Sequence, residues 1–166
     1  MTTNVTDPQK GFQLSIKTLY DIEKQLEIAL PKMADAANDP TLKQGFLDHL
    51  EETKEHSKRL EKIFEMIEEK AEKHQGETIR GLLADGDALA AIEAPEALKD
   101  EMLAGAGRNV EHFEMACYMN AIEEAKGLDL TDAVKLLEMT LADEIGADEK
   151  LEKAVKESLK RCQEAS

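Results

Sequence analysis

The chain has 166 residues and a mass of 18.4 kDa, which predicts a single domain spanning residues 1–166. Its formal net charge of -15 excludes a nucleic acid or an anionic membrane as the expected partner, because both would repel such a surface. The N-terminus has no signal-peptide pattern, no apolar run is long enough for a membrane span, and Cys117 and Cys162 lack disulfide or zinc spacing. These features predict a soluble, cytoplasmic protein.

Long amphipathic helices are predicted for the first half of the chain. Residues 1–8 are polar and predict a disordered tail. A first helix is expected over about 9–37, and Pro31 should bend it or break it locally. The sequence Asn38-Asp39-Pro40 predicts a short joint into a second helix that reaches about His74. So short a joint requires these two helices to be antiparallel.

The second half of the chain predicts another helical pair, after a weaker segment. Residues 77–94, interrupted by Gly81 and Gly86, predict a short helix that crosses the bundle. A long helix is expected over about 95–126 and another over about 131–162. Two antiparallel hairpins joined by a long crossover make an all-α, ferritin-like four-helix bundle, with the short helix lying in the crossover.

Metal-ligand residue types interrupt the apolar stripe of every long helix. An ionised carboxylate among apolar side chains is costly unless a cation, a hydrogen-bond donor or a proton compensates it. The interruptions could all meet at one level of the bundle, where either a metal site or buried salt bridges would explain them. They are Glu23 in the first helix, His49 and His56 with Glu52 beside them in the second, Glu111 and Glu114 in the third, and Glu144 and Asp148 in the last.

A pair of metal ions would account for these carboxylates. In ferritin-like dimetal proteins two helices each give one glutamate, and the other two each give Glu-x-x-His. Two divalent cations carry four positive charges, which about four carboxylates neutralise. The carboxylates expected to do so are Glu23, Glu52, one of Glu111 and Glu114, and Glu144.

Four strings of this sequence resemble the YciE/YciF family of ferritin-like bacterial stress proteins. The strings, in chain order, are LYDIEKQLEIALPKM, HLEETKEHSKRLE, RNVEHFEMACY and TLADEIGADEKL, and the resemblance extends from about residue 12 to 155. KEHSKRL and EHFEMACY are more distantly similar to rubrerythrins. The resemblance implies that Glu23, Glu52, Glu111, Glu114 and Glu144 are metal ligands.

The histidines match the ferritin-like pattern less well than the carboxylates. Thr53 stands three residues before His56, and Ala147 stands three residues after Glu144, so a strict Glu-x-x-His is absent at both places. The resemblance favours His49 over His56 as a ligand. Asp148 could be a ligand or could orient a ligand histidine. The expected metal ligands are therefore Glu23, His49, Glu52, Glu111, Glu114, Glu144 and Asp148.

The leading functional hypothesis is a non-haem dimetal protein that reacts with dioxygen or peroxide in stress protection. A ligand set rich in oxygen favours Fe(II) or Mn over Zn or Cu. Tyr20 and Tyr118 are expected near the metals, where each could hydrogen-bond a ligand or simply pack in the core. No catalytic residue is identified.

Two further hypotheses belong to other functional classes. The chain could be a non-catalytic helical interaction protein that keeps a structural or vestigial metal site, which the incomplete histidine pattern favours. It could also form a storage shell, which would require a large assembly. A homodimer is the expected oligomeric state.

Overall fold

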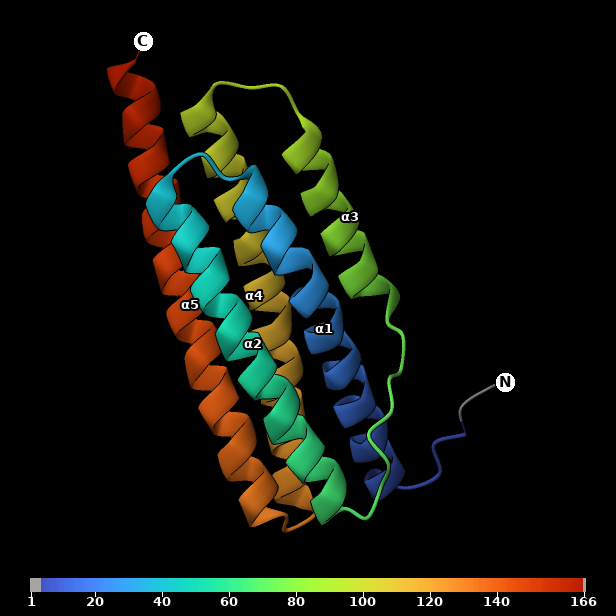
Figure 1. The fold of residues 1–166 in the computed structure, drawn as a ribbon. Helices are drawn as coiled ribbons and strands as arrows, with labels where there is room; N and C mark the ends of the chain where they lie inside the picture. The colour runs from blue at the N-terminus through green and yellow to red at the C-terminus, as the bar shows by residue number, and fades with distance from the viewer. Residues whose placement is uncertain (1–3, 166) are drawn as a thin grey trace.

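The computed structural model describes residues 4–165, and the regular secondary structure of this part of the chain is entirely helical. Four long helices form a bundle and a shorter fifth helix lies beside it (Figure 1). Their bounds are α1 Pro8–Ala36, α2 Pro40–Met66, α3 Glu77–Ala91, α4 Glu96–Gly127 and α5 Thr131–Glu164. The prediction of an all-α four-helix bundle with a short helix in the crossover is confirmed. Residues 1–3 of the predicted tail lie outside the described range, and Pro8 already belongs to α1.

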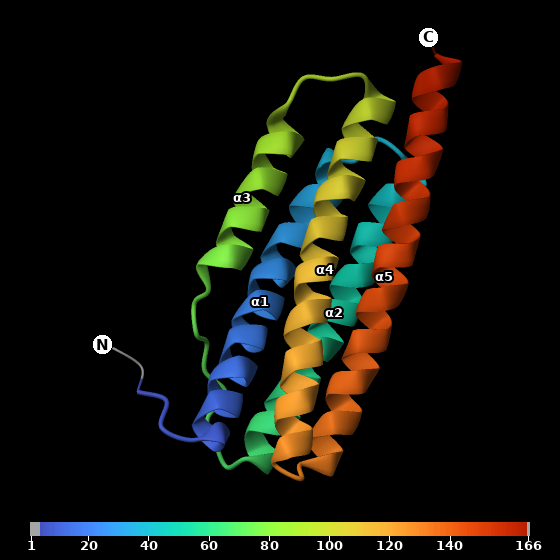
Figure 2. The ribbon, with the colours of Figure 1, turned by 180° about the vertical axis from the view of Figure 1, so that it is seen from behind.

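The connections make two antiparallel hairpins. Helix α1 packs against α2, and α4 packs against α5, with short joints at the ends of the bundle. The segment between α2 and α4 returns along the length of the bundle, so that α2 and α4 run in the same direction (Figures 1 and 2). This is the connectivity of ferritin-like bundles.

Helix α2 is shorter than predicted, because it ends at Met66 and not near His74. Glu68 adopts a left-handed conformation with φ of 55°, and the amide of Glu69 donates to the carbonyl of Phe64, which closes the helix end. The Glu- and Lys-rich sequence beyond Ile67 favours a helix locally, but it offers no apolar stripe that could pack on the bundle. The chain runs on as an exposed, non-helical segment, and the amide of His74 donates to the carbonyl of Lys17 on α1.

Two other predicted details of the helices also differ from the structure. Helix α3 does not cross the bundle but lies lengthwise beside α1 and α4, with Ile79 fully buried (Figure 2). Helix α1 continues through Pro31 without a local break, since the buried side chains of Leu30 and Met33 hold that turn on the core. A bend at Pro31 stays a prediction.

The joint between α1 and α2 is fastened by a buried carboxylate of α4. Asp100 is fully buried and accepts hydrogen bonds from the backbone amides of Asn38 (2.7 Å) and Asp39 (3.0 Å). Arg161 of α5 pairs with the same carboxylate at 3.3 Å. Asp100 therefore links the α1–α2 hairpin to the α4–α5 hairpin at one end of the bundle.

Replacing this carboxylate should destabilise the whole bundle. Asp100→Ala leaves two part-buried backbone amides without their charged acceptor, so we expect the free energy of unfolding to fall by about 3 kcal/mol. Urea denaturation measures the change. The control is Asp85→Ala, at an exposed site on α3, which should change the stability by less than about 0.5 kcal/mol. Equal effects of the two substitutions would show that Asp100 does not stabilise the joint.

Candidate metal centre

A layer of ionisable side chains lies inside the bundle, where an apolar core would otherwise continue. Each of these side chains belongs to a residue that is at most 6% exposed. They come from all four long helices and are Glu23 of α1, His49 and His56 of α2, Glu111 and Glu114 of α4, and Glu144 of α5. The apolar stripes of the helices put them there, because each residue takes a position that its helix turns toward the core.

The layer contains two groups of potential ligand atoms. In each group, one atom from every residue lies within 4.8 Å of the others. One group is His49, Glu111, Glu114 and Glu144, and the other is Glu23, His56 and Glu144. Glu144 belongs to both groups, so its carboxylate lies where it could bridge two metal ions.

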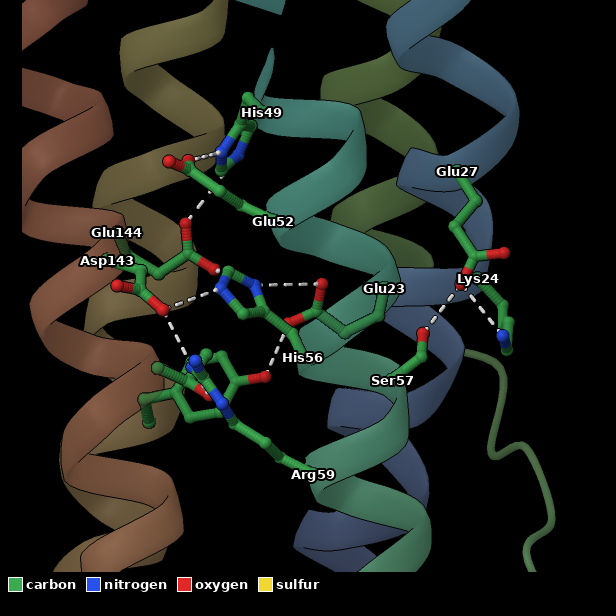
Figure 3. Close-up of polar contacts among 12 residues, drawn as sticks. Glu23, Lys24, Glu27, His49, Glu52, His56, Ser57, Arg59, Asp143 and Glu144 are labelled. Carbon is green, nitrogen blue, oxygen red and sulfur yellow. Dashed lines mark hydrogen bonds and ion pairs between the residues drawn. The ribbon is translucent and has the colours of Figure 1, made fainter. Parts of the chain in front are cut away.

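Both histidines direct one ring nitrogen at these carboxylates (Figure 3). Nε2 of His49 lies 3.2 Å from Oε1 of Glu111 and 3.6 Å from Oε2 of Glu144. Nδ1 of His56 lies 2.9 Å from Oε1 of Glu144 and 3.5 Å from Oε2 of Glu23. The two oxygens of Glu144 thus face different histidines.

The other ring nitrogen of each histidine contacts a carboxylate that lies on the side away from the layer. Oε2 of Glu52 lies 3.1 Å from Nδ1 of His49, and Oδ2 of Asp143 lies 3.3 Å from Nε2 of His56. Arg59 in turn donates to Oδ2 of Asp143 at 2.6 Å (Figure 3). Such partners fix the orientation of a ligand histidine and keep a proton on its outer nitrogen, so that the inner nitrogen is the one that a metal would contact.

Several buried polar atoms of the layer have no hydrogen-bond partner among residues 4–165. The short contacts between the histidines and the inner carboxylates lack the angles of a hydrogen bond, although they are within ion-pair distance. The unpartnered atoms are Oε2 of Glu23, Nε2 of His49, Nδ1 of His56, Oε2 of Glu111 and both carboxylate oxygens of Glu114 and Glu144. Buried polar atoms are normally satisfied, and these are nitrogen and oxygen donors that converge, so the residues fit a pair of divalent metal ions.

Burial and mutual repulsion make the layer retain protons when no metal is bound. Burial, and then the charges of Glu144 and Glu23, hold the pKa of Glu114 well above its usual value. Burial also raises the pKa of Glu144 to about 7. For His56 burial alone would lower the pKa, but Glu144 and Glu23 outweigh it and raise the pKa to about 10. A metal must therefore displace protons from this layer.

Tyr118 is the tyrosine that contacts the layer. Its hydroxyl is fully buried and donates a short hydrogen bond to Oε1 of Glu23. Burial, and then the charge of Glu23, raises the pKa of Tyr118 well above its usual value, so the phenol keeps its proton. Tyr20 instead donates to Glu61 at 2.8 Å and packs edge-on against Phe64, away from these carboxylates.

Two of the predicted ligands lie outside both groups. Glu52 is half-buried and holds His49, while its other oxygen lies 3.4 Å from Nζ of Lys150. Asp148 pairs with Arg108 at 2.7 Å and with the exposed His112 at 3.3 Å, so it contacts neither His49 nor His56. The structure places the other five predicted residues together, and it adds His56 to them.

Asp143 is a residue of the candidate site that sequence reasoning missed. It directly precedes Glu144, and no spacing within α5 distinguishes it from the many exposed acids of that helix. Its partners His56 and Arg59 come from α2. The pairing becomes visible only when the relative register of α2 and α5 is known.

Comparison with known proteins gives the family of the chain. The family described as "Domain of unknown function (DUF892)" matches residues 7–164. The chain belongs to this family. It is also 33% identical over 133 residues to "Protein YciF" of Escherichia coli (strain K12), which covers 80% of each protein. The resemblance to the YciE/YciF family is thereby confirmed.

Solved structures of similar proteins share the fold. The crystal structure of the E. coli stress protein YciF matches with a TM-score of 0.91 and 29% identity, over 94% of this chain and 99% of that one. YcfI, described as a putative structural protein from Rhodopseudomonas palustris, matches with a TM-score of 0.88 and 30% identity, over 92% and 97% of the two chains. A protein from Xanthomonas campestris pv. campestris, 18% identical over 96% and 98% of the two chains, has a TM-score of 0.76 and shows the fold alone. None of the described helices is long and apolar enough to cross a membrane.

The stability of the metal-free protein should fall as the pH rises. In the folded protein the pKa of Glu144 is about 7, against the ordinary 4.5, and that of His56 is about 10, against the ordinary 6.5. The folded state therefore binds more protons than the unfolded chain. Glu144 causes this difference between about pH 4.5 and pH 7, and His56 causes it between about pH 6.5 and pH 10. The free energy of unfolding decreases with pH in both intervals. Thermal unfolding in the presence of a chelator should give a Tm that falls steadily from about pH 5 to about pH 9.

The control for this prediction is the variant Glu144→Gln. Its Tm should depend less on pH, because the buried amide does not titrate while the acidic surface is unchanged. An identical pH dependence of the two proteins would show that surface repulsion, and not the buried layer, causes the loss.

Proposed function

We propose that this protein is a ferritin-like, non-haem dimetal protein that binds two Fe or Mn ions and reacts with dioxygen or peroxide in stress protection. The observation that carries the proposal is the set of converging, buried donor atoms without hydrogen-bond partners. A set dominated by carboxylates, with one imidazole in each group, favours these metals over softer ones. The family membership and the stress protein YciF among its relatives support the role in stress.

This proposal assigns the candidate ligands to two metal ions. Glu23 and His56 would hold one metal, His49, Glu111 and Glu114 would hold the other, and Glu144 would contact both. Redox-active metal ions in such a site supply the electrons that reduce a bound oxidant.

The surrounding side chains control proton positions and orientation. Tyr118 keeps its proton on the hydrogen bond to Glu23, which fixes the direction of that carboxylate. Glu52 and Asp143 orient the two histidines from outside. The closed packing of the four helices keeps water away from the inner carboxylates, since Glu23, Glu114 and Glu144 are fully buried.

Metal content tests the proposal directly. Protein purified without chelator, or reconstituted with Fe(II) or Mn(II), should contain about two metal ions per chain by mass spectrometry. The double variant Glu23→Gln, Glu144→Gln should lose most of this metal, because one carboxylate of one group and the shared carboxylate are gone. The control is Glu27→Gln one turn further along α1, where the carboxylate pairs with Lys24 and Ser57 and does not face the layer (Figure 3). The loaded protein should consume peroxide or dioxygen, and the double variant should not.

The carboxylate behind His56 should tune the affinity of the centre. We expect Asp143→Asn to weaken metal binding by about 10- to 100-fold, because His56 loses the charged group that orients its ring. Competition with a coloured chelator measures the affinity. Asp132→Asn, in an exposed ion pair with Lys135 on the same helix, should leave it unchanged. An unchanged affinity in both variants would mean that His56 is not a ligand.

A second candidate function is a structural one. His56 lies between Glu23 and Glu144, and the raised pKa values let the layer compensate its charges with protons alone. The relative YcfI is described as a putative structural protein, which agrees with this possibility. Protein that refuses both Fe(II) and Mn(II) on reconstitution would favour the structural function over the dimetal one.

We also propose that the protein acts as a cytoplasmic homodimer. Cys117 forms no disulfide within the described residues, which fits a reducing compartment. Light scattering tests the oligomeric state, and a large shell would instead support metal storage.

A further inference from the structure

A groove between α2 and α5 leads from the surface to the ionisable layer. Its volume is about 320 Å³, which falls in the range of small-molecule pockets. It is lined by Asp39, by α2 from Thr41 to Glu52 and by α5 from Ala147 to Arg161, and Glu111 of α4 reaches it as well. The groove follows α2 for about three turns, or roughly 16 Å. It is therefore elongated.

The inner end of the groove is formed by two candidate metal ligands. His49 and Glu111 both line it, and their side chains are only 7% and 4% exposed. Nε2 of His49 and Oε2 of Glu111 have no hydrogen-bond partner among the described residues. Both atoms are buried, so a molecule in the groove would meet the outer atoms of these two residues at its inner end.

The body of the groove is apolar. Leu42 and Phe46 of α2 face Leu151 and Ala154 of α5 across it. These four side chains offer apolar contacts and no hydrogen bonds. The body of a ligand must accordingly be apolar as well.

Most charged side chains of the groove are paired with one another. Arg161 bonds to Asp39 and Asp100 at the outer end, and Lys153 lies 3.8 Å from Glu157. Lys150 lies 3.4 Å from Glu52 near the inner end. Asp48 also lines the groove and accepts a hydrogen bond only from the neutral amide of Gln44, at 2.7 Å. The groove therefore offers no unpaired cation to an anionic ligand.

A glycine keeps the groove open. Gly45 lines it from inside α2, and a Cβ added there would meet no atom within 4 Å. Glycine within a helix is destabilising relative to alanine, so its presence needs a reason, and close packing is not that reason here. Gly107 differs, because a Cβ there would lie 2.9 Å from Leu151. Gly107 serves packing, whereas Gly45 borders the groove with open space that a larger side chain would occupy.

We propose that the groove binds an elongated, mainly apolar organic molecule with one uncharged, oxygen-bearing end, such as a medium-chain alcohol. The oxygen-bearing end lies against His49 and Glu111, and the apolar chain lies between Phe46 and Leu151. The proposal rests on the proposed dimetal function, since it names the organic ligand that this centre receives.

The charge of the ligand end decides which compound binds more tightly. The acidic side chains that line the groove outnumber its cationic ones, so an anion is repelled. The acids are Asp39, Asp48, Glu52, Glu111 and Glu157, and the cations are Lys150, Lys153 and Arg161. An uncharged alcohol does not experience this repulsion. We therefore expect 1-octanol to bind more tightly than octanoate.

The test is calorimetric titration of 1-octanol and octanoate into the wild-type protein and two glycine variants. Gly45→Leu fills the groove and should weaken 1-octanol binding by roughly tenfold or more. Gly105→Leu is the matched control, because this glycine of α4 also has open space at its Cβ but does not line the groove. Both variants should stay folded and keep the metal content of the wild type.

Several results would overturn the proposal. It fails if the wild-type protein binds neither compound, or if Gly45→Leu binds 1-octanol as tightly as Gly105→Leu does. It also fails if Gly45→Leu only changes the oligomeric state, because the groove would then be covered by a second copy of the chain.

The outcomes separate this proposal from the dimetal function. Full metal content without binding of either compound removes the organic ligand and leaves the metal centre. Binding of 1-octanol at the groove by a protein that takes up no metal removes the dimetal function and leaves the groove as a ligand site.

Discussion

The need to compensate buried negative charge determines how this bundle is built. Glu23, Glu114 and Glu144 are completely removed from water, in a region where an isolated carboxylate would cost several kcal/mol. Protons or cations must balance them, and the raised pKa values show that protons do so when no metal is present. The rest of the apolar core surrounds this layer on both sides. Stability and metal chemistry therefore depend on the same few side chains.

The two histidines of α2 show how the layer is kept in order. His49 and His56 are separated by two helical turns and present opposite ring nitrogens to the interior, Nε2 and Nδ1. Each ring has a carboxylate on its outer side, Glu52 for one and Asp143 for the other. This arrangement gives two comparable environments, and Glu144 lies between them. Glu52 has a further position, because it lies at the inner end of the groove and contacts Lys150 there.

The fold could be predicted from the sequence because its signals are local. Apolar stripes with helical spacing, Asp39-Pro40 at one joint and Gly127 at another specify helices and their ends without knowledge of distant contacts. The predicted end of α2 was wrong because this end depends on contacts that are distant in the sequence. The sequence after Met66 has good helical propensity, but only the assembled bundle shows that nothing remains for it to pack against.

The candidate site could be predicted in its residue types but not in its geometry. Acids within apolar stripes indicated Glu23, Glu111, Glu114 and Glu144, and the structure brings these four together. The positions of Glu52 and Asp143 depend on which nitrogen of each histidine turns inward, and that depends on the register between α2 and α5. The groove could not be predicted for a similar reason, because it depends on which side chains of α2 and α5 face each other.

The connection between α2 and α4 has a consequence for how the centre is assembled. Its residues 70–75 are exposed, and they join two helical hairpins. In each hairpin only a short turn separates the two helices. Each group of ligand atoms draws on both hairpins, since α1 and α2 supply Glu23, His49 and His56 while α4 and α5 supply the remainder. Neither hairpin alone carries a complete group. A metal ion bound here would bridge two halves of the chain, and cleavage within the connection would leave two fragments that metal could hold together.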